Sequence, residues 1–208
     1  IDAQYFIRAG VPDLPEWPQI LEAWNWFFSP EAVPMRAQAE GRFPMYIVMI
    51  TPELSPAAKV GGLADMVSGL SRELTRQGHA VDVVLPMYSC MRYDTIDDLR
   101  EVYSELWVPH HQEWRAEKVF EGRVDGVRAF FVTGGPYTER PSIYGYDDDL
   151  FRFVYFCRAA LEFLYKTDKR PEILHCHDWS TGLVPVMYYD LYSELGWGDS
   201  RVVFTLHN

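Results

Sequence analysis

The stretch "MYIVMITPELSPAAKVGGLADMVSGLSRELTRQGHAVDVVLP", residues 45–86, decides the fold. Residues 45–51 are apolar and rich in β-branched side chains, which predicts a buried strand. Apolar residues then recur at the spacing of a helix, at Leu63, Val67, Leu70 and Leu74. Gly78 is typical of a helix end, and residues 80–86 predict a second strand. The stretch therefore predicts two parallel strands joined by a glycine loop and a helix.

The rest of the chain repeats this alternation of strands and helices. Asp125–Gly126 lies between two strand-like runs in residues 117–133, which is the signal of a two-residue hairpin. A long helix is expected from near Asp148, because apolar residues from Leu150 to Leu164 share one face. The remaining elements are a strand at 172–177, a helix around Val184 to Leu191 with Ser180 or Thr181 as its N-cap, and a strand at 201–208. The pattern predicts an α/β domain with a mostly parallel sheet and helices on both faces.

The composition is that of a globular protein and argues against two kinds of partner. Hydrophobic residues make up 48% and charged residues 24% of the 208 residues. The net charge of −11 argues against a nucleic-acid partner, which needs a basic surface. No apolar run approaches the roughly 20 residues that span a bilayer, so we expect no membrane partner.

The cysteines indicate a reducing compartment. Cys90, Cys157 and Cys176 are odd in number and widely spaced, which favours free thiols over a disulfide framework. We therefore expect a cytoplasmic protein, or a plastid protein if the source is a plant. The chain begins with Ile1 and carries no signal-peptide pattern. We expect it to be a piece of a longer protein.

Residues 1–44 differ from the rest of the chain. They hold six prolines and an aromatic cluster formed by Trp17, Trp24, Trp26, Phe27 and Phe28. A short helix from about Pro18 to Phe28 is compatible with this composition, because proline is tolerated in the first turn. The segment is either the tail of an upstream domain or an extension that packs on the main domain, which we place at 45–208.

Three groups of polar residues lie at the carboxyl ends of predicted parallel strands. They are Lys59 with its glycines, His177–Asp178, and His207–Asn208. Carboxyl ends of parallel strands meet at one edge of a sheet, where α/β proteins bind their ligands. We therefore expect one site that contains all three groups.

The glycine loop is compatible with a structural turn or with an anion site. Gly61 and Gly62 permit positive φ angles and a close backbone approach, and the helix that follows offers unpaired N–H groups. Lys59 adds a cation, and Asp65 in the first helical turn either matches the helix dipole or orients Lys59 or a substrate hydroxyl. The loop matches neither the P-loop nor the dinucleotide fingerprint.

The histidines and an acidic triplet are further candidates. His175 and His177 share one side of a strand, but two ligands do not complete a metal site, so we expect no metal. His177, at the strand end, is the better ligand contact, and His175 reads as a satisfied core histidine. Asp147–Asp149 follow Tyr144 and Tyr146 and are compatible with helix capping or with a sugar-binding rim.

Four motifs in order resemble the N-terminal half of bacterial glycogen synthases and plant starch synthases. They are residues 46–88, "IYGYDDDLFRF" (143–153), "ILHCHDWSTGL" (173–183) and "VVFTLHN" (202–208). The resemblance covers Met45 to Asn208. It implies the first of two Rossmann-like domains that face each other across a cleft, the GT-B arrangement of glycosyltransferases.

The resemblance also implies an activity and roles for single residues. The activity is the transfer of glucose, with retention, from ADP-glucose (UDP-glucose in some relatives) to the non-reducing end of an α-1,4-glucan, without a cofactor. Lys59, Gly61, Gly62 and Asp65 would bind the donor phosphates. Asp148 and His177 would lie beside the transferred glucose as catalytic residues. The residues that would line the cleft are Tyr146, His207 and Asn208.

Two features limit what the resemblance implies. Ser180 stands where the family usually has a histidine after H-D-W, and the nucleotide-binding C-terminal domain would be a missing partner. We therefore expect the 208 residues alone to be inactive. The alternatives are a related transferase with another donor or acceptor, a non-catalytic glucan-binding module that uses the N-terminal tryptophans, and a metal hydrolase built on His175 and His177.

Overall fold

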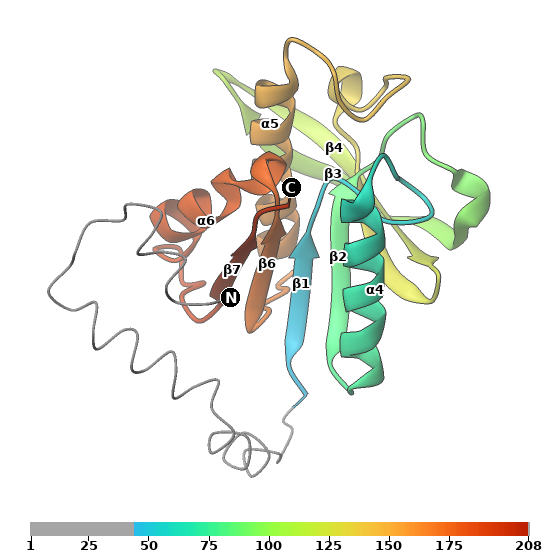
Figure 1. Cartoon of the computed structure of the whole chain (residues 1–208). Coiled ribbons are helices and arrows are strands. Elements are labelled where there is room, and N and C mark those ends of the chain that lie inside the picture. The colour runs from blue at the N-terminus through green and yellow to red at the C-terminus, as the bar shows by residue number, and fades with distance from the viewer. Residues whose placement is uncertain (1–43, 208) are drawn as a thin grey trace, which may run out of the picture. The chain divides into compact units, whose positions relative to one another are not determined.

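The computed structural model describes residues 44–207. The predicted N-terminal segment up to Phe43, with its tryptophans and its short helix, lies outside the described residues, as does Asn208. Among the described residues, the strands form a seven-stranded sheet in the order β3-β4-β5-β2-β1-β6-β7 (Figure 1).

The centre and one side of the sheet are parallel. The parallel strands are β1 (Tyr46–Ile50), β2 (Ala80–Pro86), β5 (Val127–Val132), β6 (Ile173–His177) and β7 (Arg201–Thr205). The other side ends in an antiparallel ribbon of β4 (Glu113–Val124) and β3 (Ile96–His110). The predicted mostly parallel sheet is confirmed, and β4 and β5 form the predicted hairpin at Asp125–Gly126.

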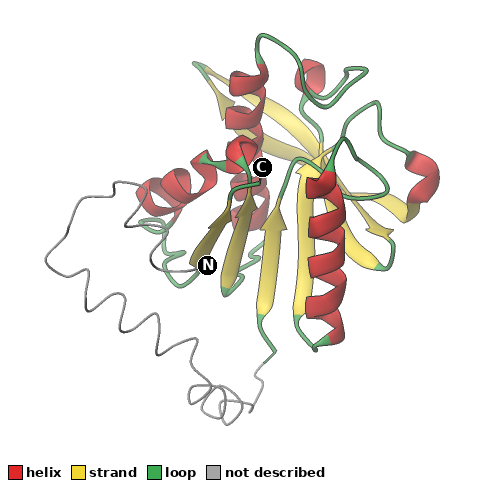
Figure 2. Cartoon of the chain, in the orientation of Figure 1, coloured by secondary structure: helices red, strands yellow, loops and turns green. Residues whose placement is uncertain are grey.

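Helices cover the sheet, as Figure 2 shows. The α-helices are α4 (Gly62–Arg76), α5 (Asp149–Lys166) and α6 (Leu183–Met187), and a π-helical turn, Tyr188–Tyr192, continues α6. Short 3-10 turns lie at Tyr93–Thr95, Gly135–Tyr137 and Trp179–Thr181. The predicted helices after the glycine loop and after the acidic triplet are confirmed, and Gly78 adopts a φ of 95° just beyond α4.

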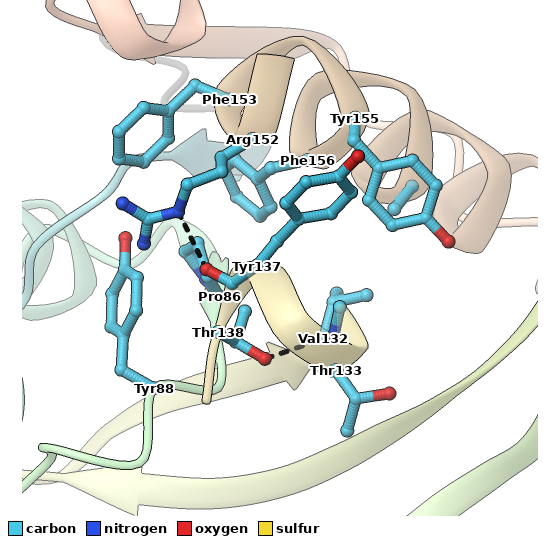
Figure 3. A pocket seen from close by; sticks show the side chains of 12 residues that line it. Pro86, Tyr88, Val132, Thr133, Tyr137, Thr138, Arg152, Phe153, Tyr155 and Phe156 are labelled. Carbon is cyan, nitrogen blue, oxygen red and sulfur yellow. Dashed lines mark hydrogen bonds between the residues drawn. The ribbon is translucent and has the colours of Figure 1, made fainter. Parts of the chain in front are cut away.

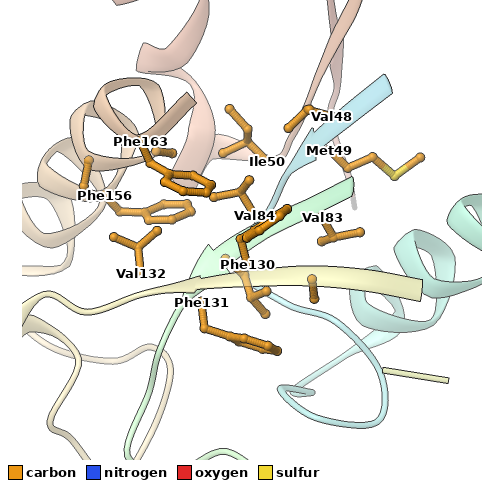
Figure 4. Close-up of a cluster of buried hydrophobic side chains, with 14 of the residues drawn as sticks. Val48, Met49, Ile50, Val83, Val84, Phe130, Phe131, Val132, Phe156 and Phe163 are labelled. Carbon is orange, nitrogen blue, oxygen red and sulfur yellow. The ribbon is translucent and has the colours of Figure 1, made fainter. Parts of the chain in front are cut away.

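The core shows that the helices lie on both faces of the sheet. Met49 of β1 faces α4, because its sulfur accepts a hydrogen bond from the Ser71 hydroxyl at 3.2 Å. On the other face, the Phe130 ring packs on Phe163 of α5 with ring centroids 5.0 Å apart (Figure 4). Neighbouring strand residues point to opposite faces, so the apolar strands bury both sides and fix the helices there.

Three local predictions were wrong or incomplete. The sequence pattern missed β3, because most of its side chains are polar and at least partly exposed in a ribbon at the edge of the sheet. The expected helix around Val184 to Leu191 is a five-residue α-helix followed by a π turn. Ser180 and Thr181 lie in a 3-10 turn and do not cap α6, whose N-cap is Gly182.

Candidate functional site

The predicted site residues gather at the carboxyl edge of the parallel strands. Lys59 lies in the loop after β1, Asp178 follows β6, and His207 follows β7. The arrowheads of β1, β2, β6 and β7 point toward the same end of the sheet (Figure 1). The expectation that these groups share one edge is therefore met by the parallel topology.

Lys59 is held at the start of α4 by Asp65. Its ammonium nitrogen lies 2.8 Å from each carboxylate oxygen of Asp65, one turn into the helix. The hydrogen bond from Lys59 lowers the pKa of the Asp65 carboxyl. The Lys59 side chain remains 46% exposed, so its charge is fixed in place and still open to solvent. A cation fixed beside a helix N-terminus makes a site that favours an anion.

The two glycines leave the helix start uncovered, although their backbone is not unusual. Gly61 is extended, with φ −141° and ψ −159°, and Gly62 is the first residue of α4. Neither residue therefore uses the positive φ angles that glycine permits. A Cβ built on either glycine meets no atom within 4 Å. The space beside both residues is therefore open at the start of α4.

Glu53 is the residue at this edge that sequence reasoning missed. Its side chain is buried, and one carboxylate oxygen accepts the N–H groups of Val60 at 2.7 Å and Gly61 at 3.1 Å. The other oxygen accepts the hydroxyl of Tyr144 at 2.9 Å. The signal in the sequence is an acidic residue just after a buried strand, because a buried carboxylate needs hydrogen-bond donors.

The acidic triplet forms a network with two arginines. Asp148 binds Arg140 through both oxygens, at 2.6 and 2.5 Å, and this hydrogen bonding lowers the pKa of the Asp148 carboxyl. The Tyr146 ring lies under the guanidinium groups of Arg140 and Arg152, at 4.6 and 5.0 Å. Asp148 and Tyr146 are therefore brought together in one rim.

Helix capping by the triplet differs from the expectation. Asp148 occupies the N-cap position of α5, but its side chain makes no capping hydrogen bond, because Arg140 holds it. Asp149 instead accepts the backbone N–H groups of Gly145 and Tyr146, at 2.8 and 3.2 Å. The aspartates thus order the segment that precedes the helix.

Arg152 holds the chain before α5 in place through backbone carbonyl groups. Its side chain is buried, and it donates to the carbonyl oxygens of Tyr137 at 2.8 Å and Ile143 at 3.2 Å. It lines a narrow pocket between α5 and the ends of β2 and β5, shown in Figure 3. That pocket is lined mainly by apolar and aromatic side chains such as Tyr88 and Phe156, so we read it as part of the interior rather than as a ligand site.

Three histidines form a row at the ends of β6 and β7. The rings of His175 and His177 lie 4.0 Å apart, and His177 Nδ1 lies 3.3 Å from Nε2 of His207. His175 is satisfied by the hydroxyl of Thr205 at 2.8 Å. The pKa of His177 is lowered to about 3, mainly by burial and to a lesser extent by the charges of His175 and His207. Its ring is therefore neutral at pH 7.

His177 lies at the end of β6, as predicted, but it is closed off from solvent. Its side chain is fully buried, and its Nε2 has no hydrogen-bond partner among the described residues. The Oγ of Ser180, three residues on, is also buried and without such a partner in this part of the chain. Within residues 44–207, no group of three or more potential ligands that could hold a metal is present.

Asp178 is a second residue that sequence reasoning left without a role. Its backbone has φ 66° and ψ 175°, a region that almost only glycine adopts without strain. Its N–H donates to the Thr205 carbonyl at 2.8 Å, which ties the strained residue to β7. The next residue, Trp179, packs its ring on Phe153 at 5.2 Å. Strained backbone of this kind gathers at functional sites.

The family of this chain follows from a comparison with protein-family models. The model of the starch synthase catalytic domain matches residues 46–208, which is most of the chain. The chain belongs to the starch synthase catalytic domain family. Relatives of this domain include glycogen synthase 1 of Nitrosococcus oceani, which is 50% identical over 165 residues, or 79% of this chain and 34% of the relative. Glycogen synthase 2 of Methylococcus capsulatus is 49% identical over 162 residues, or 76% of this chain and 33% of the relative.

A solved starch synthase structure has the same fold. It is the catalytic domain of starch synthase IV from Arabidopsis thaliana bound to ADP and acarbose, with a TM-score of 0.78 and 41% identity. The match covers 80% of this chain and 34% of that structure. The chain therefore spans about a third of the length of the relatives that it matches. This agrees with a GT-B catalytic domain of the starch synthase family, as the resemblance implied.

In this starch synthase domain, the predicted residues form two clusters. Lys59, Gly61, Gly62 and Asp65 make the start of α4, and Tyr146 and Asp148 make the rim before α5. Glu53 and Tyr144 join the two clusters by the hydrogen bond between them. His207 contacts His177 on the β7 side of the edge, and Asn208 lies outside the described residues.

Proposed function

We propose that the protein transfers glucose, with retention, from ADP-glucose to the non-reducing end of an α-1,4-glucan such as glycogen or starch. The observation that carries the proposal is the match of residues 46–208 to the starch synthase catalytic domain. The starch synthase IV structure was solved with ADP and acarbose, a nucleotide and an oligosaccharide analogue. ADP corresponds to part of an ADP-glucose donor, and acarbose resembles a glucan acceptor.

Lys59 and the start of α4 receive the diphosphate of the donor in this proposal. The departing diphosphate gains negative charge, and a fixed cation with helix N–H groups stabilises it without rearrangement. Asp65 keeps the ammonium group in that place, at 2.8 Å. Gly61 and Gly62 let the phosphates approach, because no side chain covers the backbone there.

Asp148 and His177 lie beside the transferred glucose in the same proposal. The sugar develops oxocarbenium character as the bond to the diphosphate breaks, so a nearby carboxylate such as Asp148 stabilises it. His177 supplies a hydrogen bond rather than a charge, because its pKa of about 3 keeps it neutral. Tyr146, His207 and Asn208 line the cleft.

The site is completed by a second, nucleotide-binding domain that faces this one. The proposal is supported by the extent of the matches, which span only about a third of the length of these relatives. Residues 45–208 then form the acceptor-side domain, and residues 1–44 remain an extension or the tail of an upstream domain. Cations of both domains carry the diphosphate charge, so we propose transfer without a metal ion.

The protein acts in the cytoplasm in this proposal. The thiols of Cys90, Cys157 and Cys176 are free, which suits a reducing compartment. Among the described residues, no helix has the length and apolar character to cross a membrane.

The test is glucan elongation by the protein at its full natural length. Purified protein is given glycogen with labelled ADP-glucose or UDP-glucose, with and without EDTA. We expect incorporation from ADP-glucose that EDTA does not abolish, with new α-1,4 linkages in the product. Preference for UDP-glucose would correct the donor, and loss of activity with EDTA would overturn the metal-free proposal.

A further inference from the structure

We propose that Glu53 is a positioning residue that holds the glycine loop and the acidic rim in one arrangement for donor binding. The glycine loop is residues 59–62, and the acidic rim is residues 144–149. The inference rests on the proposed function and adds a residue that the four family motifs did not single out for a role. It starts from the two-sided hydrogen bonding of one buried carboxylate.

On one side, Glu53 fixes the glycine loop next to Lys59. Its Oε2 accepts the N–H of Val60 at 2.7 Å and that of Gly61 at 3.1 Å. These are the two residues between Lys59 and the first residue of α4. A loop that contains two glycines has high backbone entropy, so it needs such anchors to hold one shape. Glu53 thereby fixes where the chain that carries Lys59 enters the helix.

On the other side, Glu53 fixes the acidic rim. Its Oε1 accepts the hydroxyl of Tyr144 at 2.9 Å, and the Tyr144 ring lies 5.7 Å from Phe153 and 6.3 Å from Trp179. Trp179 directly follows Asp178 at the end of β6. One carboxylate therefore connects the chain after β1, the chain before α5 and the chain after β6.

Glu53 acts through these neighbours rather than on the substrate. The side chain is only 3% exposed, and Val60, Gly61 and Tyr144 already engage both of its carboxylate oxygens, so it does not bind a sugar or phosphate itself. Its negative charge is met by the Val60 and Gly61 N–H groups, which are then engaged. The phosphates are left to Lys59 and to the N–H groups of the first turn of α4, which have no partner within the helix. Misplacing the loop would displace both groups at once.

A matched pair of buried carboxylates separates positioning from mere stability. Glu117 of β4 is also buried, at 6% exposure, and it accepts the hydroxyls of Thr133 and Tyr155, each at 2.7 Å. It lies outside the glycine loop and the acidic rim. Glu53→Ala and Glu117→Ala both remove a buried carboxylate, so both should lower the melting temperature. Only the first should change how the donor binds.

The experiment measures KM and kcat for ADP-glucose in the full-length protein, with the amount of folded protein taken from circular dichroism. We expect Glu53→Ala to raise KM about tenfold or more, because small misplacements of binding groups are costly. Glu53→Gln, which keeps an oxygen acceptor for the loop, should restore KM to within about threefold of the wild type. Glu117→Ala should leave KM unchanged.

A double variant tests the route through Lys59. If Glu53 acts by placing Lys59, Glu53→Ala should add little to the KM of Lys59→Ala. Equal KM values for Glu53→Ala and Glu117→Ala, or full additivity with Lys59→Ala, would overturn the inference. If Glu53→Ala does not fold, Tyr144→Phe and Glu53→Gln provide the comparison, and wild-type KM in Tyr144→Phe would count against it. A wild-type protein that transfers no glucose would refute the proposed function instead.

Discussion

The ammonium group of Lys59 is hydrogen-bonded to both carboxylate oxygens of Asp65, each at 2.8 Å. The pair spans the two glycines at the start of α4, so it fixes a positive charge beside the positive end of the helix dipole. The Lys59 ammonium and this end of the dipole are both positive, and the Asp65 carboxylate offsets the repulsion between them. The pair thereby explains why a lysine and an aspartate flank Gly61 and Gly62.

Asp65→Asn tests whether this pair places the lysine for the donor. We expect KM for ADP-glucose to rise about three- to tenfold, because Lys59 loses its fixed position. The free energy of unfolding should stay close to that of the wild type, because an exposed ion pair contributes little to stability. Glu73→Gln is the control, since it removes an exposed ion pair with Arg76 in the same helix. Equal KM values in the two variants would contradict the role of Asp65.

Asp148→Asn tests the rim that we place beside the glucose. We expect kcat/KM to fall about tenfold, because the carboxylate charge that stabilises the sugar is lost. Arg140→Ala should give a similar loss, and the double variant no more than either, since the two side chains form one unit. Asp147→Asn, at the exposed neighbouring position, should be unchanged. A loss in Asp147→Asn as large as in Asp148→Asn would contradict this assignment.

The buried ring of His177 should make stability depend on pH. Its folded pKa of about 3 lies below the ordinary value of 6.5, so the unfolded chain binds more protons between these pH values. The stability that comes from the neutral ring is therefore present above pH 6.5 and is lost as the pH falls toward 3. His177 contributes a slope of at most about 1.4 kcal/mol per pH unit.

His177→Gln should flatten the fall in unfolding free energy between pH 6.5 and 4.5, measured by urea unfolding. His111→Gln is the control, because His111 is exposed and lies away from this row of histidines. An unchanged slope in His177→Gln would show that His177 is protonated in the folded protein, contrary to its burial.

Asp178→Gly should separate stability from activity. Glycine relieves the strain of φ 66° and ψ 175°, which costs about 1–3 kcal/mol, at an entropic cost of about 0.5–1 kcal/mol. We expect the unfolding free energy to rise by about 1 kcal/mol while kcat/KM falls, because the end of β6 loses its fixed direction. Asp168→Gly, at a φ of 55° in the turn after α5, should not lower activity. A fall in stability for Asp178→Gly would contradict the strain account.

Much of the fold could be predicted from the sequence because its parallel strands are buried on both faces. Runs such as residues 45–51 are apolar throughout, and the amphipathic helices that follow them have a clear period. Strand β3 could not be found in this way. Most of its residues, such as Asp97, Arg100 and Glu101, are at least partly exposed in an edge ribbon. Within this strand only Ile96, Leu106 and Val108 are buried, so most of its length shows no alternation of apolar and polar residues.

The site was predictable where a residue follows a strand and not where its role depends on tertiary contacts. Lys59 and His207 follow strands and His177 is the last residue of one, so topology alone brings them to one edge. Glu53 acquires its role from Tyr144, which is 91 positions away, and no local pattern announces that pairing. The strained backbone of Asp178 and the full burial of His177 likewise depend on the neighbouring strand β7.

The most direct test of the account is the transfer of labelled glucose from ADP-glucose to glycogen by wild-type protein, Lys59→Ala and Lys118→Ala, all at full natural length. Lys118 is a matched control, because it too is a half-exposed lysine paired with a carboxylate, that of Glu101. The account predicts transfer by the wild type and by Lys118→Ala, and a loss of about 100-fold or more in kcat/KM for Lys59→Ala. Wild-type protein without activity, or Lys59→Ala as active as Lys118→Ala, would contradict it.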